Sequence, residues 1–238
     1  MHSHSNSPHA RVYAGRDKLA VVGAGGHGKV VAAAALAAGC WREIVFLDDG
    51  MAAGSTVIGL PVVGGVGMVQ EGIRPQDYDI AVAVGDNGRR AQLAGRLKEL
   101  GFVMPDIVHP NAVLAPYVSL GGGCVVCAGA VVQPGSVLGE GCIVNTAATV
   151  DHDCMLGAFV HISPGAHLAG GTHIGAQSWI GIGAVTRQQT RIGSGVVVGA
   201  GAVVVKDIAD GITAVGNPAR PIREKRPSEH GSDGSQEK

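Results

Sequence analysis

An aliphatic side chain returns every six positions from residue 114 onward. The residues that keep this phase are Leu114, Leu120, Val126, Val132, Leu138, Val144, Val150, Leu156, Ile162, Leu168, Ile174, Ile180, Ile192, Val198 and Val204. Thr186 is the one position at which the series is interrupted. A fixed short period is typical of a solenoid whose coils pack on their neighbours, and a six-residue period predicts a parallel β-helix.

A different pattern precedes the repeat. Two apolar runs, Leu19 to Val22 and Ile44 to Leu47, are separated by a glycine turn and an alanine-rich stretch that Gly39 closes. This order predicts a β-α-β unit. A third apolar run, in DIAVAVGDNGRR, leads into another glycine turn and a helical stretch that ends near Gly101. We therefore expect a small α/β Rossmann-like domain over residues 18–107 and a β-helix domain over residues 108–222.

The first glycine turn fits the spacing G-x-G-x-x-G, and Asp48 follows about where a ribose-binding acid is expected. Amides at a helix N-terminus bind phosphates, although such glycines can also serve only to permit a tight turn. The turn after the third strand would lie at the same sheet edge. The candidate substrate-binding residues at this edge are Gly23, Gly25, Gly26, His27, Gly28, Asp48, Asp49, Gly85, Asn87 and Arg89. For Arg89, a solvated charge at the start of a helix is an equal alternative.

Composition narrows the class of protein. The chain has 39 glycines among 238 residues and only 3% aromatic residues, which suits a repeat with many tight turns. A formal net charge of −1 supplies no basic field for nucleic acid or an anionic membrane, and we expect neither partner. No apolar run is long enough for a membrane span, and five cysteines are an odd number for a disulfide framework. We expect a cytoplasmic protein with a disordered leader over residues 1–17 and a disordered tail over residues 223–238.

Candidate chemistry centres on His152, which stands between Asp151 and Asp153. A carboxylate that accepts a hydrogen bond from one imidazole nitrogen fixes the tautomer and raises the basicity of the other nitrogen. This arrangement suits a general base near neutral pH. No cysteine lies in an obviously electropositive setting, so the sequence nominates no covalent intermediate.

Hexapeptide repeats behind a short nucleotide-binding domain, with the motifs GAGGHG, FLDD, VNTAATVDHD and GNPAR, resemble one known family. This is the sialic acid O-acetyltransferase and nucleotide-sugar 4-amino N-acetyltransferase family. The resemblance implies a left-handed β-helix with three hexapeptides per coil and a homotrimer with active sites between chains. It also implies acetyl-CoA as co-substrate and a UDP- or GDP-linked 4-amino-deoxy sugar as acceptor, in bacterial glycan biosynthesis. Aliphatic outer rows that need cover, such as Val125, Val131, Val137 and Ile143, agree with a trimer.

The same resemblance implies roles for individual residues. His152 matches the family's catalytic base, and Asp153 matches the orienting carboxylate, which is Glu in the relative compared. His161 matches a histidine near the thioester of acetyl-CoA. Gly170 and Gly199 are assigned to cofactor binding, and Asn145 to the acceptor.

Three hexapeptides per coil also decide how the remaining histidines lie. Residues six apart then point from different faces of the prism, so His161, His167 and His173 cannot chelate one ion within a chain. We predict no metal site, although a zinc site shared between chains, as in gamma-type carbonic anhydrases, stays an alternative.

Other functions remain open from the sequence. An O-acetyltransferase acting on a sialic acid belongs to the same class. An NAD-dependent oxidoreductase is suggested by the glycine motif and Asp48, but the chain supplies no second mononucleotide half. A non-catalytic β-helix scaffold is the third alternative.

Overall fold

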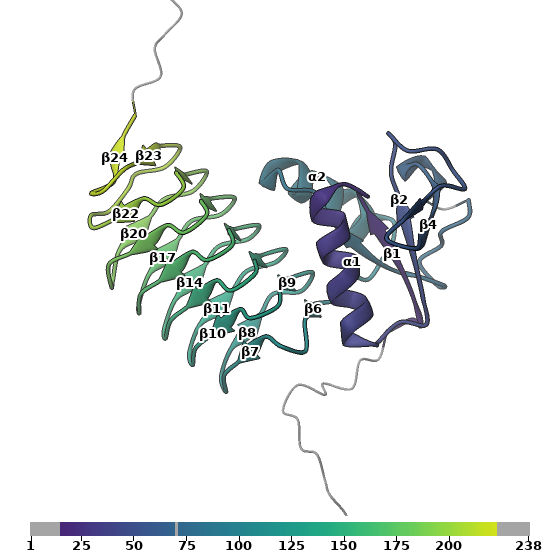
Figure 1. Cartoon of the computed structure of the whole chain (residues 1–238), viewed down its shortest axis with the longest axis horizontal. Coiled ribbons are helices and arrows are strands. Elements are labelled where there is room, and N and C mark those ends of the chain that lie inside the picture. The colour runs from purple at the N-terminus through teal and green to yellow at the C-terminus, as the bar shows by residue number, and fades with distance from the viewer. Residues whose placement is uncertain (1–14, 70, 223–238) are drawn as a thin grey trace, which may run out of the picture.

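The structure, a computed structural model, describes residues 15–69 and 71–222. A small α/β domain stands beside a long stack of short strands (Figure 1). This is the architecture that the two sequence patterns predict. Most of the expected leader and the whole expected tail lie outside the described residues. Arg16 and Asp17 are described, and the amide of Arg16 donates to Asp79 while Asp17 pairs with Arg42.

The first domain is built on one sheet with strand order β3-β4-β2-β1-β5. Its elements are β1 (Lys18–Val22), α1 (Gly26–Ala38), β2 (Glu43–Leu47), β3 (Thr56–Val57), β4 (Leu60–Gly64), a 3-10 turn (Val66–Met68), β5 (Asp79–Val82) and α2 (Asn87–Glu99). Strands β1, β2, β4 and β5 are parallel, so the turns after β1 and β5 meet at one edge as expected. Strands β3 and β4 were not predicted.

The second domain is a parallel β-solenoid of two-residue strands in three sheets. One sheet holds β7 (Val113–Leu114), β10 (Val131–Val132), β13 (Thr149–Val150), β16 (His167–Leu168), β19 (Val185–Thr186) and β22 (Val203–Val204). We call it sheet E. The next, sheet F, holds β8 (Ser119–Leu120), β11 (Val137–Leu138), β14 (Met155–Leu156), β17 (His173–Ile174) and β20 (Arg191–Ile192).

The third sheet, sheet D, begins the solenoid and ends it. It holds β6 (Ile107–Val108), β9 (Val125–Val126), β12 (Ile143–Val144), β15 (His161–Ile162), β18 (Trp179–Ile180), β21 (Val197–Val198), β23 (Thr213–Val215) and β24 (Arg220–Pro221). Strand pairing joins residues eighteen apart, as in Ile143, His161 and Trp179, so each coil takes three hexapeptides.

Each coil turns its corners at a residue with positive φ. The position recurs every six residues, and glycine fills it at Gly129, Gly135 and Gly141, for example. Ala147 and Asp153 occupy the same position with φ values of 54° and 57°. Because L side chains rarely adopt this conformation, the corner explains why glycine recurs at this position.

The aliphatic residues of the hexapeptide phase form the dry interior of the solenoid. Thr186, which interrupts the phase, also points inward and is buried. Its hydroxyl accepts from the amide of Ala169 at 3.0 Å and pairs with the hydroxyl of Thr172 at 3.0 Å. A polar side chain is tolerated there because its hydrogen bonds are made.

Helix α1 covers the start of sheet D (Figure 1). Val125 and Ile143 are buried in one cluster with Val31 and Ala32 of α1. The expectation that these two outer residues need a partner chain is therefore wrong, because the chain's own helix covers them. Val137, on sheet F, is 41% exposed.

Candidate active site

The glycine turn after β1 is tightly packed. A β-carbon on Gly28 would collide with the carbonyl oxygen of Gly23, and Gly23 itself has a φ of 101°. Around Gly25 and Gly26 there is no atom within 4 Å of such a carbon, and both residues are exposed. The turn therefore presents open backbone at the start of α1, which suits the approach of a phosphate.

The two aspartates after β2 hold neighbouring loops. The carboxylate of Asp48 accepts from the amides of Ala24 at 2.8 Å and Gly50 at 2.9 Å. Asp49 accepts from the amide of Val66 at 2.7 Å. Asp48 thus fixes the shape of the glycine turn at the sheet edge where sequence reasoning placed it.

Helix α2 begins at the same edge and joins the first domain to the solenoid. Asn87 donates to the carbonyls of Gln177 and Ser178, at 3.1 Å each. The Arg90 guanidinium, 3% exposed, donates to the carbonyls of Gly141 at 3.2 Å and Phe159 at 2.9 Å. It also donates to Asn87, at 2.8 Å. The Asn87 side chain is therefore engaged in the seam between the domains, which we call the domain seam.

Three aromatic rings line the domain seam beside the glycine turn. The His27 and His161 ring centroids are 6.0 Å apart, and the Trp179 ring stacks on His161 at 5.8 Å with an interplanar angle of 8°. The Asn145 Nδ2 lies 3.1 Å from the His161 Nε2. His27 and Asn145, predicted from different parts of the sequence, are thus brought to one cluster with His161 between them.

Both histidines of this cluster are neutral at physiological pH. Burial, and then the charge of Arg90, lowers the pKa of His27 to about 4. Burial, then His27 and then Arg90, lowers the pKa of His161 to about 3. Neither ring is suited to take up a proton near neutral pH.

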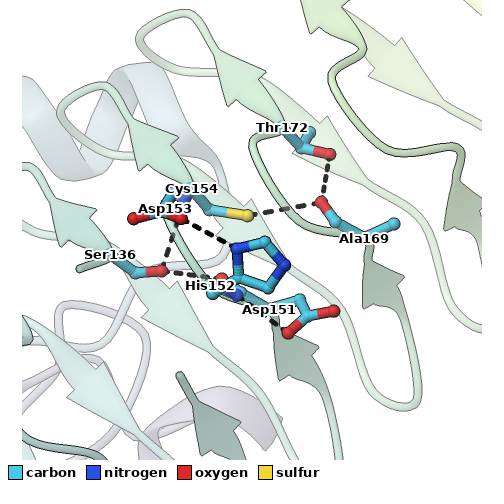
Figure 2. Close-up of polar contacts among 7 residues, drawn as sticks. All are labelled: Ser136, Asp151, His152, Asp153, Cys154, Ala169 and Thr172. Atoms are coloured by element: carbon cyan, nitrogen blue, oxygen red, sulfur yellow. Dashed lines mark hydrogen bonds and ion pairs between the residues drawn. The ribbon is translucent and has the colours of Figure 1, made fainter. Parts of the chain in front are cut away.

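His152 lies at the corner between sheets E and F, after β13 and before β14. Its Nδ1 is 2.8 Å from Oδ2 of Asp153, while its backbone amide donates to Asp151 at 2.8 Å (Figure 2). The hydrogen bond to Asp153, followed by the charge of Asp151, raises the pKa of His152. The second nitrogen, Nε2, points away from Asp153 (Figure 2).

Glycines make room for this pair. A β-carbon on Gly170, which lies one coil beyond His152, would be 2.5 Å from the His152 Nε2. A β-carbon on Gly135 would be 2.5 Å from Oδ1 of Asp153. The positive φ of Asp153 places its carboxylate at a corner that glycine occupies in many other coils. The two glycines therefore leave the space that the imidazole and the carboxylate occupy.

Other predicted positions lie apart from both clusters. Arg89 is exposed at the start of α2, and its backbone amide donates to the Asp86 carboxylate. Gly85 is exposed on the turn before it. Gly199 follows β21 and packs against Val215. His161, His167 and His173 lie on sheets D, E and F, which confirms that they leave the solenoid on different faces.

A groove of about 740 Å³ runs along sheet F and the corner that follows it, at Gly157, Gly175 and Gly193. Val137, Met155 and Ile174 give it an apolar floor, and His173, Arg191 and Asp207 give it polar sites. Such a long, mainly apolar groove can hold an extended ligand with a charged end.

Sequence reasoning missed Arg90 and Trp179. The buried residues of α2, Asn87, Arg90, Ala94 and Leu97, recur at three- and four-residue steps, so helical periodicity could have placed Arg90 inward in preference to Arg89. Trp179 could have been found from the eighteen-residue step that stacks it on His161.

Residues 15–69 and 71–222 contain neither a cluster of metal-ligating side chains nor a helix suited to span a membrane. No group of three or more His, Cys, Asp or Glu side chains is placed to hold a metal ion there. No helix in that part of the chain has the length and apolar character needed to cross a membrane.

Both domains match known protein families. Residues 18–97 match the family described as PglD N-terminal domain, and residues 171–206 match bacterial transferase hexapeptide repeats. The chain is 57% identical to the acetyltransferase domain of PglB from Neisseria gonorrhoeae FA1090, over 87% of this chain and 100% of that one, with a TM-score of 0.85. A second structure of that domain contains acetyl coenzyme A.

Two further solved structures are similar over the same span. PerB from Caulobacter crescentus, in complex with CoA and GDP-perosamine, is 38% identical over 87% of this chain and 97% of that one, with a TM-score of 0.79. WeeI from Acinetobacter baumannii AYE is 31% identical over 86% and 99%, also with a TM-score of 0.79.

Proposed function

The chain belongs to the family of nucleotide-sugar N-acetyltransferases that join a PglD N-terminal domain to hexapeptide repeats, and we propose how its residues carry out this transfer. It is an acetyl-CoA-dependent acetyltransferase. The acceptor is the amino group of a nucleotide-linked amino sugar, a UDP- or GDP-linked 4-amino-deoxy sugar. His152 is the general base, and the acetyl group passes directly from the thioester to the amine.

The observation that carries this mechanism is the His152–Asp153 pair. Asp153 holds Nδ1 at 2.8 Å, which leaves Nε2 as the basic nitrogen. As the amine attacks the thioester carbon, a C–N bond forms, the C–S bond breaks, and Nε2 takes the amine proton. The proton then passes to the departing thiolate. A base whose pKa lies near the working pH suits both steps.

The groove on sheet F supports the placement of acetyl-CoA. Its apolar floor at Val137 and Met155 suits the pantetheine arm, and Arg191 suits a phosphate. Gly170, whose lack of a side chain leaves room for the His152 ring, lies at the corner before this sheet, where we place the thioester close to the His152 Nε2. Gly199 stays a proposed cofactor contact farther along the solenoid.

The acceptor is assigned to the glycine turn and the carboxyl edge of the first sheet. Open amides at Gly25 and Gly26 suit the diphosphate. Asp48 and Asp49 shape this edge, and Gly85 and Arg89 are exposed beside it. The proposed domain limits remain residues 18–107 and 108–222, and the proposed compartment is the cytoplasm.

A homotrimer is part of the proposal. Within one chain the glycine turn faces sheet D, at His161, whereas His152 lies at the corner of sheets E and F. The two part-sites are on different sides of the prism. A neighbouring chain that brings its His152 corner to this chain's domain seam would complete a site, which three chains around an axis can do three times.

The test is an acetyl-transfer assay with the full chain. UDP- and GDP-linked 4-amino sugars are offered with acetyl-CoA, and the product is identified by its added acetyl mass. The matching 4-hydroxy sugars and a sialic acid test for O-acetylation. We expect His152→Ala to lower kcat by about 10² to 10⁴, the range for losing a positioned general base.

His167→Ala is the matched control, because His167 is another exposed histidine of the solenoid, with its own partner Thr149. It should keep parent activity. Parent turnover in His152→Ala at pH 7 would overturn His152 as the base.

A further inference from the structure

We propose that the buried guanidinium of Arg90 is the counter-charge for the diphosphate of the acceptor. It acts on the ligand through its electric field, from within the domain seam. The identity of the ligand rests on the proposed function, whereas the buried charge is a feature of the fold. Because Arg90 does not touch substrate in this proposal, it is not a catalytic residue.

Arg90 carries its charge in a place where it meets no carboxylate. Its guanidinium donates only to uncharged oxygens, which are the carbonyls of Val84, Gly85, Gly141 and Phe159 and the side-chain oxygen of Asn87. Within residues 15–69 and 71–222, Arg90 takes part in no ion pair. Burial lowers the pKa of Arg90 to about 10, which leaves the group protonated at physiological pH.

The carboxylates near Arg90 serve other groups. Glu140 lines the same small cavity, but it pairs with Lys98 at 2.8 Å. Asp86 accepts from the backbone amide of Arg89 at 2.7 Å, at the start of α2. A buried charge without an opposite charge is costly, because carbonyl dipoles satisfy its donors but do not cancel its net charge. The positive charge of Arg90 therefore remains available to an anionic ligand.

Arg90 lies next to the sheet edge at which the diphosphate is placed. Two of its hydrogen bonds, of 3.1 and 3.4 Å, end on the turn that follows β5. That turn abuts the glycine turn, since a β-carbon on Gly23 would be 2.9 Å from the carbonyl oxygen of Ala83. The charge also acts on His27, in the first turn of α1, whose pKa is lowered by burial and then by Arg90. Its field therefore reaches the open amides of the glycine turn through a poorly polarisable interior.

This edge needs a positive charge, because carboxylates also gather there. Asp48 and Asp49 follow β2, and Asp86 follows β5. Each accepts from backbone amides, and each repels an anion. The N-termini of α1 and α2 supply partial positive charge, and neither helix has an acidic side chain in its first turn. Arg90 adds a full charge in a region that salt screens weakly.

The test compares two kinds of substitution at Arg90 in the full chain. Arg90→Met removes the charge. Arg90→Lys keeps it, because the same carbonyl oxygens can accept from an ammonium group, but it loses the forked hydrogen bonds. Dissociation constants are measured at pH 7 for UDP, UMP and uridine, or for the guanine series if the parent binds that one. Arg90→Gln, which is also neutral but keeps an amide donor, is used if circular dichroism shows that Arg90→Met does not fold.

We expect the neutral variants to lose affinity according to the charge of the ligand. At an effective dielectric constant of about 20, two unit charges about 10 Å apart change a dissociation constant by about tenfold. The Kd for the diphosphate should therefore rise by about tenfold or more, and that for the monophosphate should rise less. The Kd for the nucleoside should change by less than about twofold. Arg90→Lys should keep the Kd for the diphosphate within about threefold of the parent value.

Arg96→Met is the matched control, because it removes the same charge from an exposed position in the last turn of the same helix. It should leave all three dissociation constants within about twofold. An equal loss for diphosphate and nucleoside in a folded neutral variant would overturn the counter-charge. So would a loss in Arg90→Lys as large as that in the neutral variant. Either result in a parent that transfers acetyl groups would leave the proposed function intact, whereas a parent that binds no nucleoside diphosphate would overturn both.

Discussion

Gly170 lies one coil beyond His152, and a β-carbon at that position would be 2.5 Å from the imidazole Nε2. The His152 Nε2, which we propose as the base, thus lies against a glycine, and any larger residue at that position would collide with it.

We predict that Gly170→Ala displaces the imidazole without unfolding the chain, because the His152 side chain is 62% exposed and can rotate away. A small displacement of a catalytic group costs up to about 10² in rate. We expect kcat to fall by about tenfold to 10²-fold, measured with saturating substrates. Gly95→Ala, where the added carbon has no neighbour within 4 Å, is the control and should keep parent kcat. Parent kcat in Gly170→Ala would contradict the placement of the reacting groups.

Asp153 raises the pKa of His152, so the activity of the parent should fall as pH drops through that raised value. Asp153→Asn removes the carboxylate but keeps the imidazole. We expect its inflection in a plot of kcat/KM against pH to move to lower pH, and its rate loss at pH 7 to be smaller than that of His152→Ala. An inflection that persists in His152→Ala would assign it to another group.

The Arg90 guanidinium is buried among carbonyl oxygens of both domains. Arg90→Met should leave the carbonyls of Gly141 and Phe159 unpaired, at about 1–3 kcal/mol each. We expect a loss of several kcal/mol in the free energy of unfolding by denaturant, and earlier melting of the first domain. Arg89→Met, at the exposed neighbouring position, should change stability by less than about 0.5 kcal/mol. Equal effects of the two substitutions would contradict the role of the seam.

His27 and His161 have lowered pKa values in the folded chain, about 4 and about 3. Below the ordinary histidine pKa the unfolded chain binds protons that the folded chain does not, so stability is complete above that value and falls as pH drops. Between pH 7 and pH 5 each ring should cost about 2 kcal/mol of stability, from about 1.36 kcal/mol per pKa unit. Denaturant unfolding at the two pH values measures this. His161→Phe should lose about half of the pH dependence that the two rings cause, and an unchanged dependence would show that these rings are not its source.

If each active site is built from two chains, two impaired variants should complement each other. His152→Ala and Asp48→Ala, each impaired alone, should recover activity when their trimers are dissociated, mixed and reassembled, because some interfaces then combine an intact His152 with an intact glycine turn. Light scattering should report three chains per particle before and after mixing. No recovery in mixed trimers, or a monomer at micromolar concentration, would contradict a site built from two chains.

The solenoid could be predicted because its information is local and repeated. Ile162 and Leu168 occupy the same phase of the hexapeptide, and burying that phase leaves one arrangement of coils. Strand β4 could not be predicted in the same way, because Pro61 and the surrounding glycines obscure a strand that its pairing with β2 and β3 stabilises.

The site was predictable in part. His152 and Asp153 are adjacent in the sequence, so their contact needed no tertiary information. The cluster of His27, Asn145 and His161 brings together residues more than a hundred positions apart, and only the docking of α1 and α2 on sheet D decides it. Arg90 was not predicted, because the glycine turn after β5 favoured its exposed neighbour Arg89 as the candidate for ligand binding.

Pairing of residues eighteen apart also sets a unit of length. Parallel strands lie about 4.8 Å apart, so the chain can be extended along its axis only in steps of that size. Gly170 lies one such step from His152, and His161 lies one step from Ile143. An inserted coil would keep this strand pairing within the stack. It would shift the His152 corner relative to the glycine turn by one full step along the axis. The number of coils therefore sets the position of the His152 corner along the solenoid axis. The reaction depends on this number as well as on the side chains of the site.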